Sequence, residues 1–146
     1  MFQIIVGSQM GAAEYVADEL AEALQALGHQ AVVHEHPQYD KIPQQDVYWL
    51  ICTSTHGAGD LPDNIQPFIA ALKESAPILA DLKYGVIALG DRSYDTFCQA
   101  GHQIDQILTS LGAQRSAQLL EIDVKNAVSP EDQALEWLPT WLKSTL

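Results

Sequence analysis

Short apolar segments alternate with amphipathic ones along the whole chain, and this alternation restricts the fold more than any other feature. Apolar runs at residues 2–6, 47–53 and 84–89 are each followed by glycine or small polar residues, which is typical of buried strands. Weaker runs at 30–35 and 119–124 predict two further strands. Strands that alternate with helices form a parallel sheet covered on both faces. The sequence therefore predicts a doubly wound α/β fold with five parallel strands.

Four segments with helical periodicity separate or follow these strands. In the segment 11–27, apolar residues recur on one helical face. The second helix is expected to begin near Asp63 or Asn64, because both are good N-caps. The third helix is expected to stop at Gly112, and Ser129 is expected to cap the fourth.

The size and charge of the chain limit its organisation and its partners. Its 146 residues contain no long linker, which predicts a single domain over 1–146. There are 19 Asp and Glu against 7 Lys and Arg, so nucleic acid and anionic membranes are poor partners and a basic protein is a plausible one. No apolar run is long enough to span a membrane, and the N-terminus does not resemble a signal peptide. A cytoplasmic monomer is expected.

The cysteines and histidines do not form a recognisable metal or dithiol motif. Cys52 and Cys98 lie far apart without CxxC spacing, which argues against a zinc site or a redox pair. Cys52 is expected to be buried, whereas Cys98 is either a structural residue or a reactive thiol. His34 and His36 share one face of a strand, but no third ligand is evident, so no metal is expected.

The first of three unusual loops, residues 7–14, joins a strand directly to a helix. In a doubly wound sheet, ligands bind beyond the carboxyl ends of the strands, where the strand order reverses. Small residues in this loop let backbone N–H groups converge on an anion at the helix N-terminus. The loop contains neither GxxxxGK[ST] nor GxGxxG, which disfavours a nucleoside triphosphate and a nicotinamide dinucleotide. A phosphate monoester held by neutral groups fits better.

Two further loops follow the strands at 47–53 and 84–89. The loop at 53–64 combines hydroxyls, glycines and carboxylates, and a flat ring can lie against such a backbone. In the loop at 90–98, Tyr94 is an aromatic side chain among polar ones and can stack on a planar ligand. Each loop alone is also explained as a polar turn. Because all three meet at one edge of the predicted sheet, together they predict a binding site.

The three loops together resemble those of the flavodoxin family. The segment GSQMGAAE resembles the phosphate-binding loop GSQTGTAE in the flavodoxin-type domains of diflavin reductases. The segment THGAGDLPDN resembles their TYGEGDPTDN loop, and ALGDRSYDTFC resembles the pattern GLGN-x-x-Y-x-x-FC. The resemblance covers essentially the whole chain and is greatest to the short flavodoxins of the MioC and YqcA type. It implies the strand order 2-1-3-4-5 and a non-covalently bound FMN.

The same resemblance implies which residues contact FMN. Met10 and Ala12 stand where the reductase domains carry Thr, so two hydroxyls are missing and FMN retention is expected to be weaker. Tyr94 is implied to stack on the outer face of the ring. The complete implied set is Ser8, Gln9, Met10, Gly11, Ala12 and Ala13 around the phosphate, Thr53, Ser54, Thr55, His56, Gly57, Ala58 and Gly59 along one side of the ring, and Gly90, Asp91, Ser93, Tyr94, Phe97 and Cys98 around the rest of the pocket.

For function, the resemblance implies an electron carrier and not an enzyme. Such a protein passes single electrons from an NADPH-dependent flavodoxin or ferredoxin reductase to an acceptor enzyme, and FMN performs the redox chemistry. The acidic loops are expected to form the docking face. Two alternatives remain open, namely a flavin-dependent reductase that reacts directly with a nicotinamide and an interaction module that has lost its flavin. A signalling receiver domain is disfavoured, because the first strand is followed by Gly7 and Ser8 and not by an acidic pair.

Overall fold

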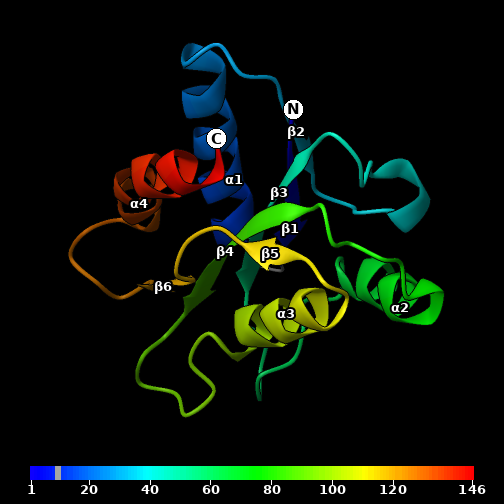
Figure 1. The fold of residues 1–146 in the computed structure, drawn as a ribbon. Helices are drawn as coiled ribbons and strands as arrows, with labels where there is room; N and C mark the ends of the chain where they lie inside the picture. The colour runs from blue at the N-terminus through cyan, green and yellow to red at the C-terminus, as the bar shows by residue number, and fades with distance from the viewer. Residues whose placement is uncertain (9–10) are drawn as a thin grey trace.

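One twisted parallel sheet forms the centre of the computed structural model, which describes residues 1–8 and 11–146 (Figure 1). Neighbouring strands follow the order β2-β1-β3-β4, and both β5 and β6 pair with β4. The strands are β1 (Phe2–Gly7), β2 (Ala31–His34), β3 (Tyr48–Ser54), β4 (Lys83–Gly90), β5 (Gln114–Arg115) and β6 (Leu120–Asp123).

The predicted order 2-1-3-4-5 is confirmed, but the last position in the sheet is divided between two strands. The predicted strand at 119–124 corresponds to β6, which pairs with the carboxyl end of β4 from Ile87 to Gly90. The unpredicted β5 pairs with Lys83 and Tyr84 at the start of β4. Because β5 has only two exposed polar residues, it leaves no apolar periodicity by which a sequence pattern reveals a strand.

The helices cover the sheet on both faces (Figure 1). One face packs against α1 and α4, and the other packs against α2 and α3. Ser129 caps α4 as predicted, because its Oγ accepts a hydrogen bond of 3.3 Å from the N–H of Asp132. The helices are α1 (Ala12–Ala26), α2 (Gln66–Ser75), α3 (Gln99–Ser110) and α4 (Pro130–Thr145), with a short 3-10 helix η1 (Tyr39–Lys41).

Side chains of the central strands alternate between two hydrophobic cores. Ile4 and Leu50 belong to the core under α1 and α4, whereas Ile5 and Ile51 belong to the core under α2 and α3. This two-residue alternation follows from the pleat of a strand. Both faces are therefore apolar, which explains why β1 and β3 are continuous hydrophobic runs in the sequence.

The second helix begins close to the expected place, but the expectation that Asp63 or Asn64 caps it is wrong. Helix α2 begins at Gln66, and no side chain caps its first turn. The amide of Asn64 is instead hydrogen-bonded to the backbone of Val6, Ser8 and Glu35. A side chain engaged with those distant segments is not available to cap its own helix.

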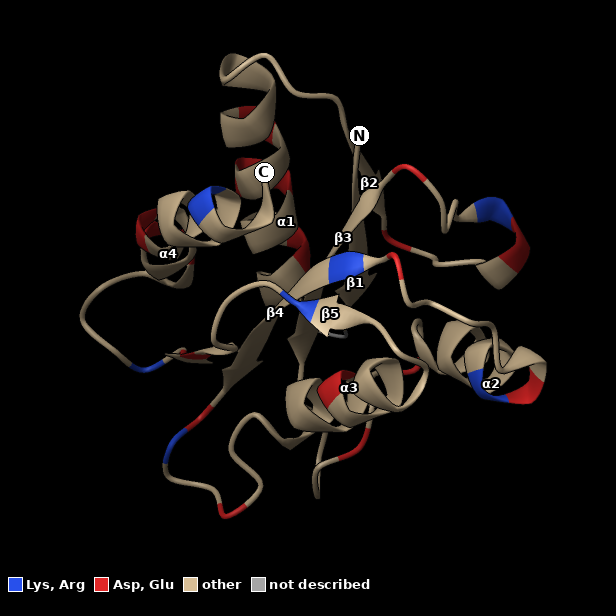
Figure 2. Cartoon of the chain, viewed as in Figure 1, with Lys and Arg blue, Asp and Glu red and all other residues tan. Residues whose placement is uncertain are grey.

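Charged side chains are unevenly distributed over this framework (Figure 2). Helix α1 carries acidic residues and no Lys or Arg, and the loop that follows β4 carries both signs close together. In the described ranges 1–8 and 11–146, no helix is long and apolar enough to cross a membrane.

Candidate functional site

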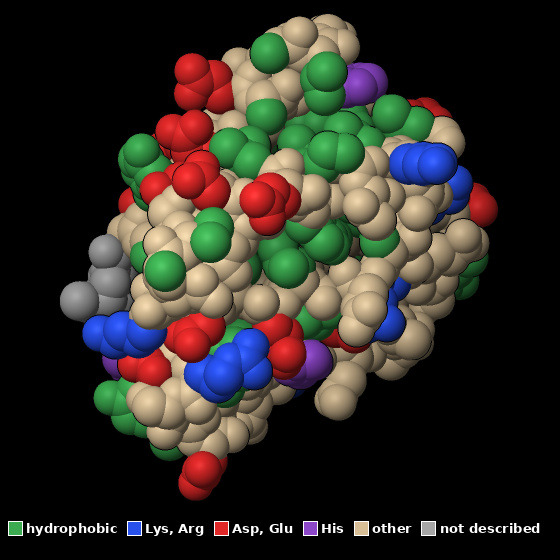
Figure 3. Space-filling view, turned by 90° about the vertical axis from the view of Figure 1, so that its left-hand side faces the viewer, with side chains coloured by type: hydrophobic (Ala, Val, Ile, Leu, Met, Phe, Trp, Pro, Cys, Tyr) green, Lys and Arg blue, Asp and Glu red, His purple; other side chains and the backbone are tan. Residues whose placement is uncertain are grey.

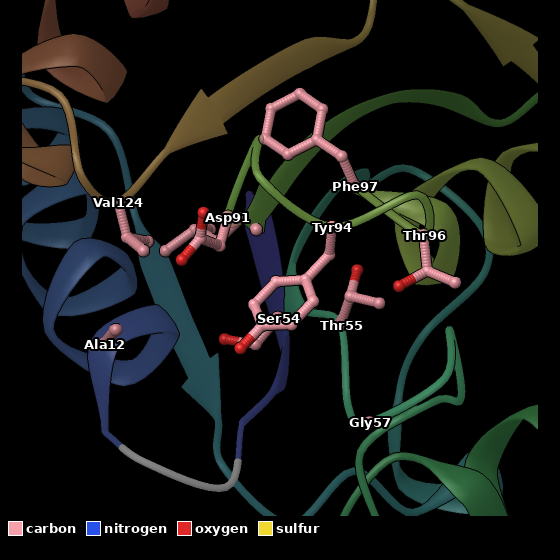
Figure 4. A pocket seen from close by; sticks show the side chains of 11 residues that line it. Ala12, Ser54, Thr55, Gly57, Asp91, Tyr94, Thr96, Phe97 and Val124 are labelled. Atoms are coloured by element: carbon pink, nitrogen blue, oxygen red, sulfur yellow. The ribbon is translucent and has the colours of Figure 1, made fainter.

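A cavity of about 510 Å³ opens at the carboxyl ends of β3 and β4, beside the first turn of α1. Its volume lies within the range of small-molecule and cofactor sites. Figure 4 shows the side chain of Tyr94 in front of Ser54, with Asp91 to one side and Gly57 on a separate loop. The lining residues are Ala12, Ser54, Thr55, Gly57, Leu89, Gly90, Asp91, Tyr94, Thr96, Phe97 and Val124.

The first loop reaches the cavity through the start of α1. Ser8 is buried, and its Oγ accepts a hydrogen bond of 3.0 Å from the N–H of Gly11. Gly11 has φ of +85°, a conformation that glycine adopts without steric cost, and it is the N-cap residue of α1. Ala12 lines the cavity, whereas the Ala13 side chain is buried in the core. The predicted residues Gln9 and Met10 lie outside the described residues.

The second loop folds into a tight turn between His56 and Asp60. The N–H of His56 donates to the carbonyl of Asp60 at 2.9 Å, and the N–H of Asp60 donates back at 2.8 Å. Gly57 and Gly59 inside the turn have φ of +49° and +105°, which explains the two glycines in the sequence. Gly57 lines the cavity, and a Cβ at this position would have no neighbour within 4 Å. The His56 and Ala58 side chains are exposed and do not line the cavity.

The third loop contributes the most exposed aromatic ring at the cavity. Tyr94 is 65% exposed although it lines the cavity, so its ring is free to meet a ligand. Asp91 accepts hydrogen bonds from the N–H and the Oγ of Ser93, at 2.9 and 2.6 Å. These bonds stabilise the carboxylate and hold the pKa of Asp91 below its ordinary value. A negative charge therefore lies at the cavity wall at neutral pH.

Three predicted residues lie beneath the cavity and not in it. Thr53, Ala13 and Cys98 are fully buried, so their side chains do not reach a ligand in the cavity. The Cys98 thiol donates to the carbonyl of Ala88 at 3.1 Å, and burial raises the pKa of this thiol to about 12. Of the two interpretations of Cys98, the structure favours the structural one. Contacts between the backbone of these residues and a cofactor stay a prediction.

Three lining residues were not among the predicted ones. Leu89 is the last apolar residue of β4, and Thr96 lies within the third loop between predicted positions. Val124 follows β6, and its N–H donates to the carbonyl of Gly90 at 2.9 Å. Because β6 lies next to β4, its carboxyl end reaches the same edge of the sheet. The sequence signal for Val124 was its place at the end of the predicted strand 119–124.

In the part of the chain that the structure describes, no three His, Cys, Asp or Glu side chains are placed so that they could hold a metal ion. His34 instead lies 2.6 Å from Gln3, measured between Nε2 and Oε1. Burial lowers the pKa of His34, which favours its neutral form.

A doubly wound sheet with the strand order 2-1-3-4-5 and a cavity beyond the carboxyl ends of β3 and β4 is the architecture of flavodoxin-like proteins. The sequence model of the family described as flavodoxin matches residues 4–137, and the chain belongs to the flavodoxin family. Flavodoxins are electron carriers and not enzymes, and membership implies a flavin cofactor.

Individual relatives agree with this assignment. The chain is 42% identical to Protein MioC of Escherichia coli K12 over 139 residues, covering 95% of this chain and 94% of that protein. It is 44% identical to Flavodoxin YqcA of the same organism over 139 residues, covering 94% and 93%. Among solved structures, a flavodoxin from Pseudomonas aeruginosa with a cysteine-to-serine substitution superposes with a TM-score of 0.90 at 35% identity, covering 98% of this chain and 97% of that one.

Proposed function

We propose that this protein binds FMN non-covalently and carries single electrons from an NADPH-dependent flavodoxin or ferredoxin reductase to an acceptor enzyme. The observation that carries the proposal is a cavity of about 510 Å³ with a helix N-terminus at Ala12 and the exposed ring of Tyr94 in its lining. A phosphate on one end of a ligand and a flat ring on the other need these two features together.

The start of α1 fits a phosphate that is held without a basic side chain. The first N–H groups of a helix have no partner within the helix, and their dipoles favour an anion. The Gly11 N–H already donates to Ser8, so the N–H groups of residues 12–14 are the ones available. The first Lys or Arg in the sequence is Lys41, so neutral donors must supply the binding.

The other side of the cavity fits a flat ring. Tyr94 offers a face for stacking, and Ser54, Thr55 and Gly57 line the opposite loop. The Thr55 Oγ1 accepts a hydrogen bond of 3.3 Å from the N–H of Ala100, which ties this loop to α3. When bound, FMN supplies the electron-transfer chemistry, and the protein binds and orients it. The ionised Asp91 disfavours further negative charge nearby, which lowers the reduction potential.

The experiment that tests FMN binding is a fluorescence titration of the purified protein. We expect FMN emission to be quenched at micromolar protein. Tyr94→Ala should weaken binding about two- to tenfold, the range of aromatic stacking energies. Tyr15→Ala removes a similarly exposed tyrosine from α1 and should leave FMN affinity unchanged. Unquenched FMN at micromolar protein would contradict the proposal and favour an interaction module that has lost its flavin.

The predicted acidic loops and a second acidic surface on α1 and α4, which includes Glu19 and Glu131, suit a basic face on a reductase. Figure 3 shows acidic side chains gathered on the side where α1 and α4 lie, above the loops of the cavity. The charges of Glu19 on α1 and Glu131 on α4 both raise the pKa of Tyr15, so acidic groups of two helices surround one side chain. Complementary charge accelerates association and is screened by salt.

The docking proposal is tested by the salt dependence of the reduction rate. Between about 0.01 M and about 1 M salt the Debye length falls from about 30 Å to about 3 Å, so reduction by the reductase should slow. A rate that does not respond to salt would contradict docking through the acidic surface. Direct oxidation of NADPH by the FMN-loaded protein alone would favour the flavin-dependent reductase instead. The cytoplasmic location and the monomeric state stay predictions.

A further inference from the structure

The side chain of Asn64 links three backbone segments at the edge of the proposed phosphate site. Its Oδ1 accepts a hydrogen bond of 2.8 Å from the N–H of Ser8. Its Nδ2 donates to the carbonyls of Val6 and Glu35, each at 2.8 Å. Val6 belongs to β1, and Glu35 directly follows β2. The amide therefore joins the ends of two strands to the first residue of the loop that leads to α1.

This amide takes the place of a missing peptide group in the sheet. The pairing of β1 with β2 ends at Ile5 and His34, one residue before Val6. In a parallel ladder, the carbonyl of a paired residue accepts a hydrogen bond from the N–H of the residue after its partner. The N–H of the same residue donates to the carbonyl of the residue before its partner. The Asn64 side chain makes the same two bonds with Gly7 in the place of the partner residue. Its Oδ1 accepts from the N–H of Ser8, and its Nδ2 donates to the carbonyl of Val6. The side chain thus extends the ladder beyond the point where β2 leaves it.

The bonding pattern admits one orientation of the amide. A carboxamide has one acceptor oxygen and one NH₂ donor. Exchanging the two would set NH₂ against the Ser8 N–H and the oxygen against two carbonyl oxygens. Both contacts would be repulsive, so three bonds hold Asn64 and Ser8 in one relative position.

From Ser8 the restraint continues to the start of α1. The Ser8 Oγ accepts a hydrogen bond of 3.0 Å from the N–H of Gly11, which is the N-cap residue of α1. We propose that Asn64 is a positioning residue for the phosphate half of the FMN site, since it fixes Ser8 and, through Ser8, the helix N–H groups that receive the phosphate. This inference rests on the proposed function. Asn64 itself does not line the cavity and is not proposed to contact the ring.

Riboflavin distinguishes a phosphate-specific effect from a general one, because it has the same ring and no phosphate. We expect Asn64→Ala to weaken FMN binding about tenfold, because the bond that holds the Ser8 N–H is lost and one hydrogen bond contributes a factor of about 2 to 13. Riboflavin affinity should stay within about twofold of the wild type. Asn64→Ser leaves a shorter polar side chain that can replace at most one of the three bonds, so its loss of FMN preference should be no greater than that of Asn64→Ala. The measurement is a pair of fluorescence titrations for each protein, with far-UV circular dichroism to monitor folding.

Asn126→Ala is the matched control. Asn126 also uses its Oδ1 to accept a backbone N–H, that of Val128, at 2.9 Å, but it lies in the exposed turn after β6. Its replacement should leave the ratio of riboflavin to FMN dissociation constants unchanged.

The inference would be overturned if Asn64→Ala lost FMN and riboflavin affinity in equal measure, or lost neither. Unfolding of both Asn64 variants would also overturn it, because the bonds would then hold the fold and not the loop. A wild type that binds neither flavin would instead refute the proposed function.

Discussion

The guanidinium carbon of Arg92 lies 4.5 Å from the centre of the Phe97 ring, within the loop that carries Tyr94. The same side chain reaches across to β6, where its Nε is 3.9 Å from Asp123 Oδ2. Arg92 therefore links two segments at the cavity, namely the loop after β4 and the end of β6. Phe97, which Arg92 covers, lines the cavity. A single exposed arginine thus stabilises the arrangement of both segments.

Replacing Arg92 by Gln should loosen this arrangement. An exposed cation–π contact contributes about 0.5–1 kcal/mol, which corresponds to a two- to fivefold change in FMN affinity if the loop must be held for binding. The free energy of unfolding should fall by no more than about 1 kcal/mol, because the Arg92 side chain of this ion pair is largely exposed. Lys73→Gln on α2 removes one positive charge away from the cavity and is the control. Equal FMN affinity in all three proteins would contradict the prediction.

Gly57 should govern how the second loop responds to reduction of the cofactor. Its φ of +49° is unfavourable for side chains with a Cβ, and β-branched valine is the most restricted. We expect Gly57→Val to strain the turn and hinder rotation of the peptide between His56 and Gly57. This rotation would let the peptide carbonyl accept a hydrogen bond from the ring nitrogen that is protonated when bound FMN is reduced. The separation between the two one-electron potentials of the FMN-loaded protein should then change, as measured by a redox titration. An unchanged separation would exclude a role for this peptide.

Gly101 should be essential for the packing of α3 on β4. A Cβ at this position would lie 2.4 Å from the Cβ of Ala88 and 3.3 Å from its Cα. Overpacking of a core costs about 1–3 kcal/mol, whereas the higher helix propensity of alanine returns at most about 1 kcal/mol. Gly101→Ala should therefore lower the free energy of unfolding by about 1–2 kcal/mol in denaturant titrations. Adding Ala88→Gly should recover part of the loss, and strictly additive effects would rule out the clash.

Tyr84 should make stability depend on alkaline pH. Its side chain is fully buried, and its hydroxyl donates to Asp105 Oδ1 at 2.5 Å. Burial first, and the bond to Asp105 second, raise the pKa of Tyr84 to about 12. Because the folded pKa lies above the ordinary value of about 10, the stabilisation is complete below pH ~10 and disappears as the pH rises toward ~12.

Tyr84→Phe tests this dependence. A difference of about 2 pKa units corresponds to about 3 kcal/mol. The free energy of unfolding of the wild type should therefore fall more steeply than that of Tyr84→Phe between pH ~10 and pH ~12. Identical slopes in the two proteins, measured by denaturant titration at each pH, would show that Tyr84 ionises as freely in the folded protein as in the unfolded one.

Both thiols should be inert in the folded protein. Cys52 and Cys98 are fully buried, and burial raises the pKa of each thiol, for Cys98 to about 12. The thiolate is the reactive form, so Ellman's reagent at pH ~8 should modify neither residue in native protein. Both should react once guanidinium unfolds the chain. Rapid reaction of one thiol in the native state, assigned with Cys98→Ser, would restore the reactive-thiol interpretation.

The main elements of the fold follow from local pattern. Strands β1, β3 and β4 are long apolar runs, and their ends are marked by glycine or small polar residues, so their positions along the chain and the loops that follow them were predictable. Their order within the sheet was implied by the resemblance to the flavodoxin family. Strand β5 was not, because two polar residues carry no periodicity. The site was likewise predicted as three loops, and Tyr94, Asp91 and Gly57 do line one cavity.

The sequence by itself determined where the long strands, the helices and the glycine turns occur, because these depend on neighbouring residues and on the backbone freedom of residues such as Gly11 and Gly57. Only the tertiary structure decided what Asn64 and Cys98 do. Asn64 resembles a helix cap in sequence, yet it bonds to Ser8, which is 56 residues away. Cys98 follows a polar loop, yet its thiol lies under β4. Such contacts depend on the register of the strands and the packing of α3, which bring distant segments together and leave no mark in local periodicity.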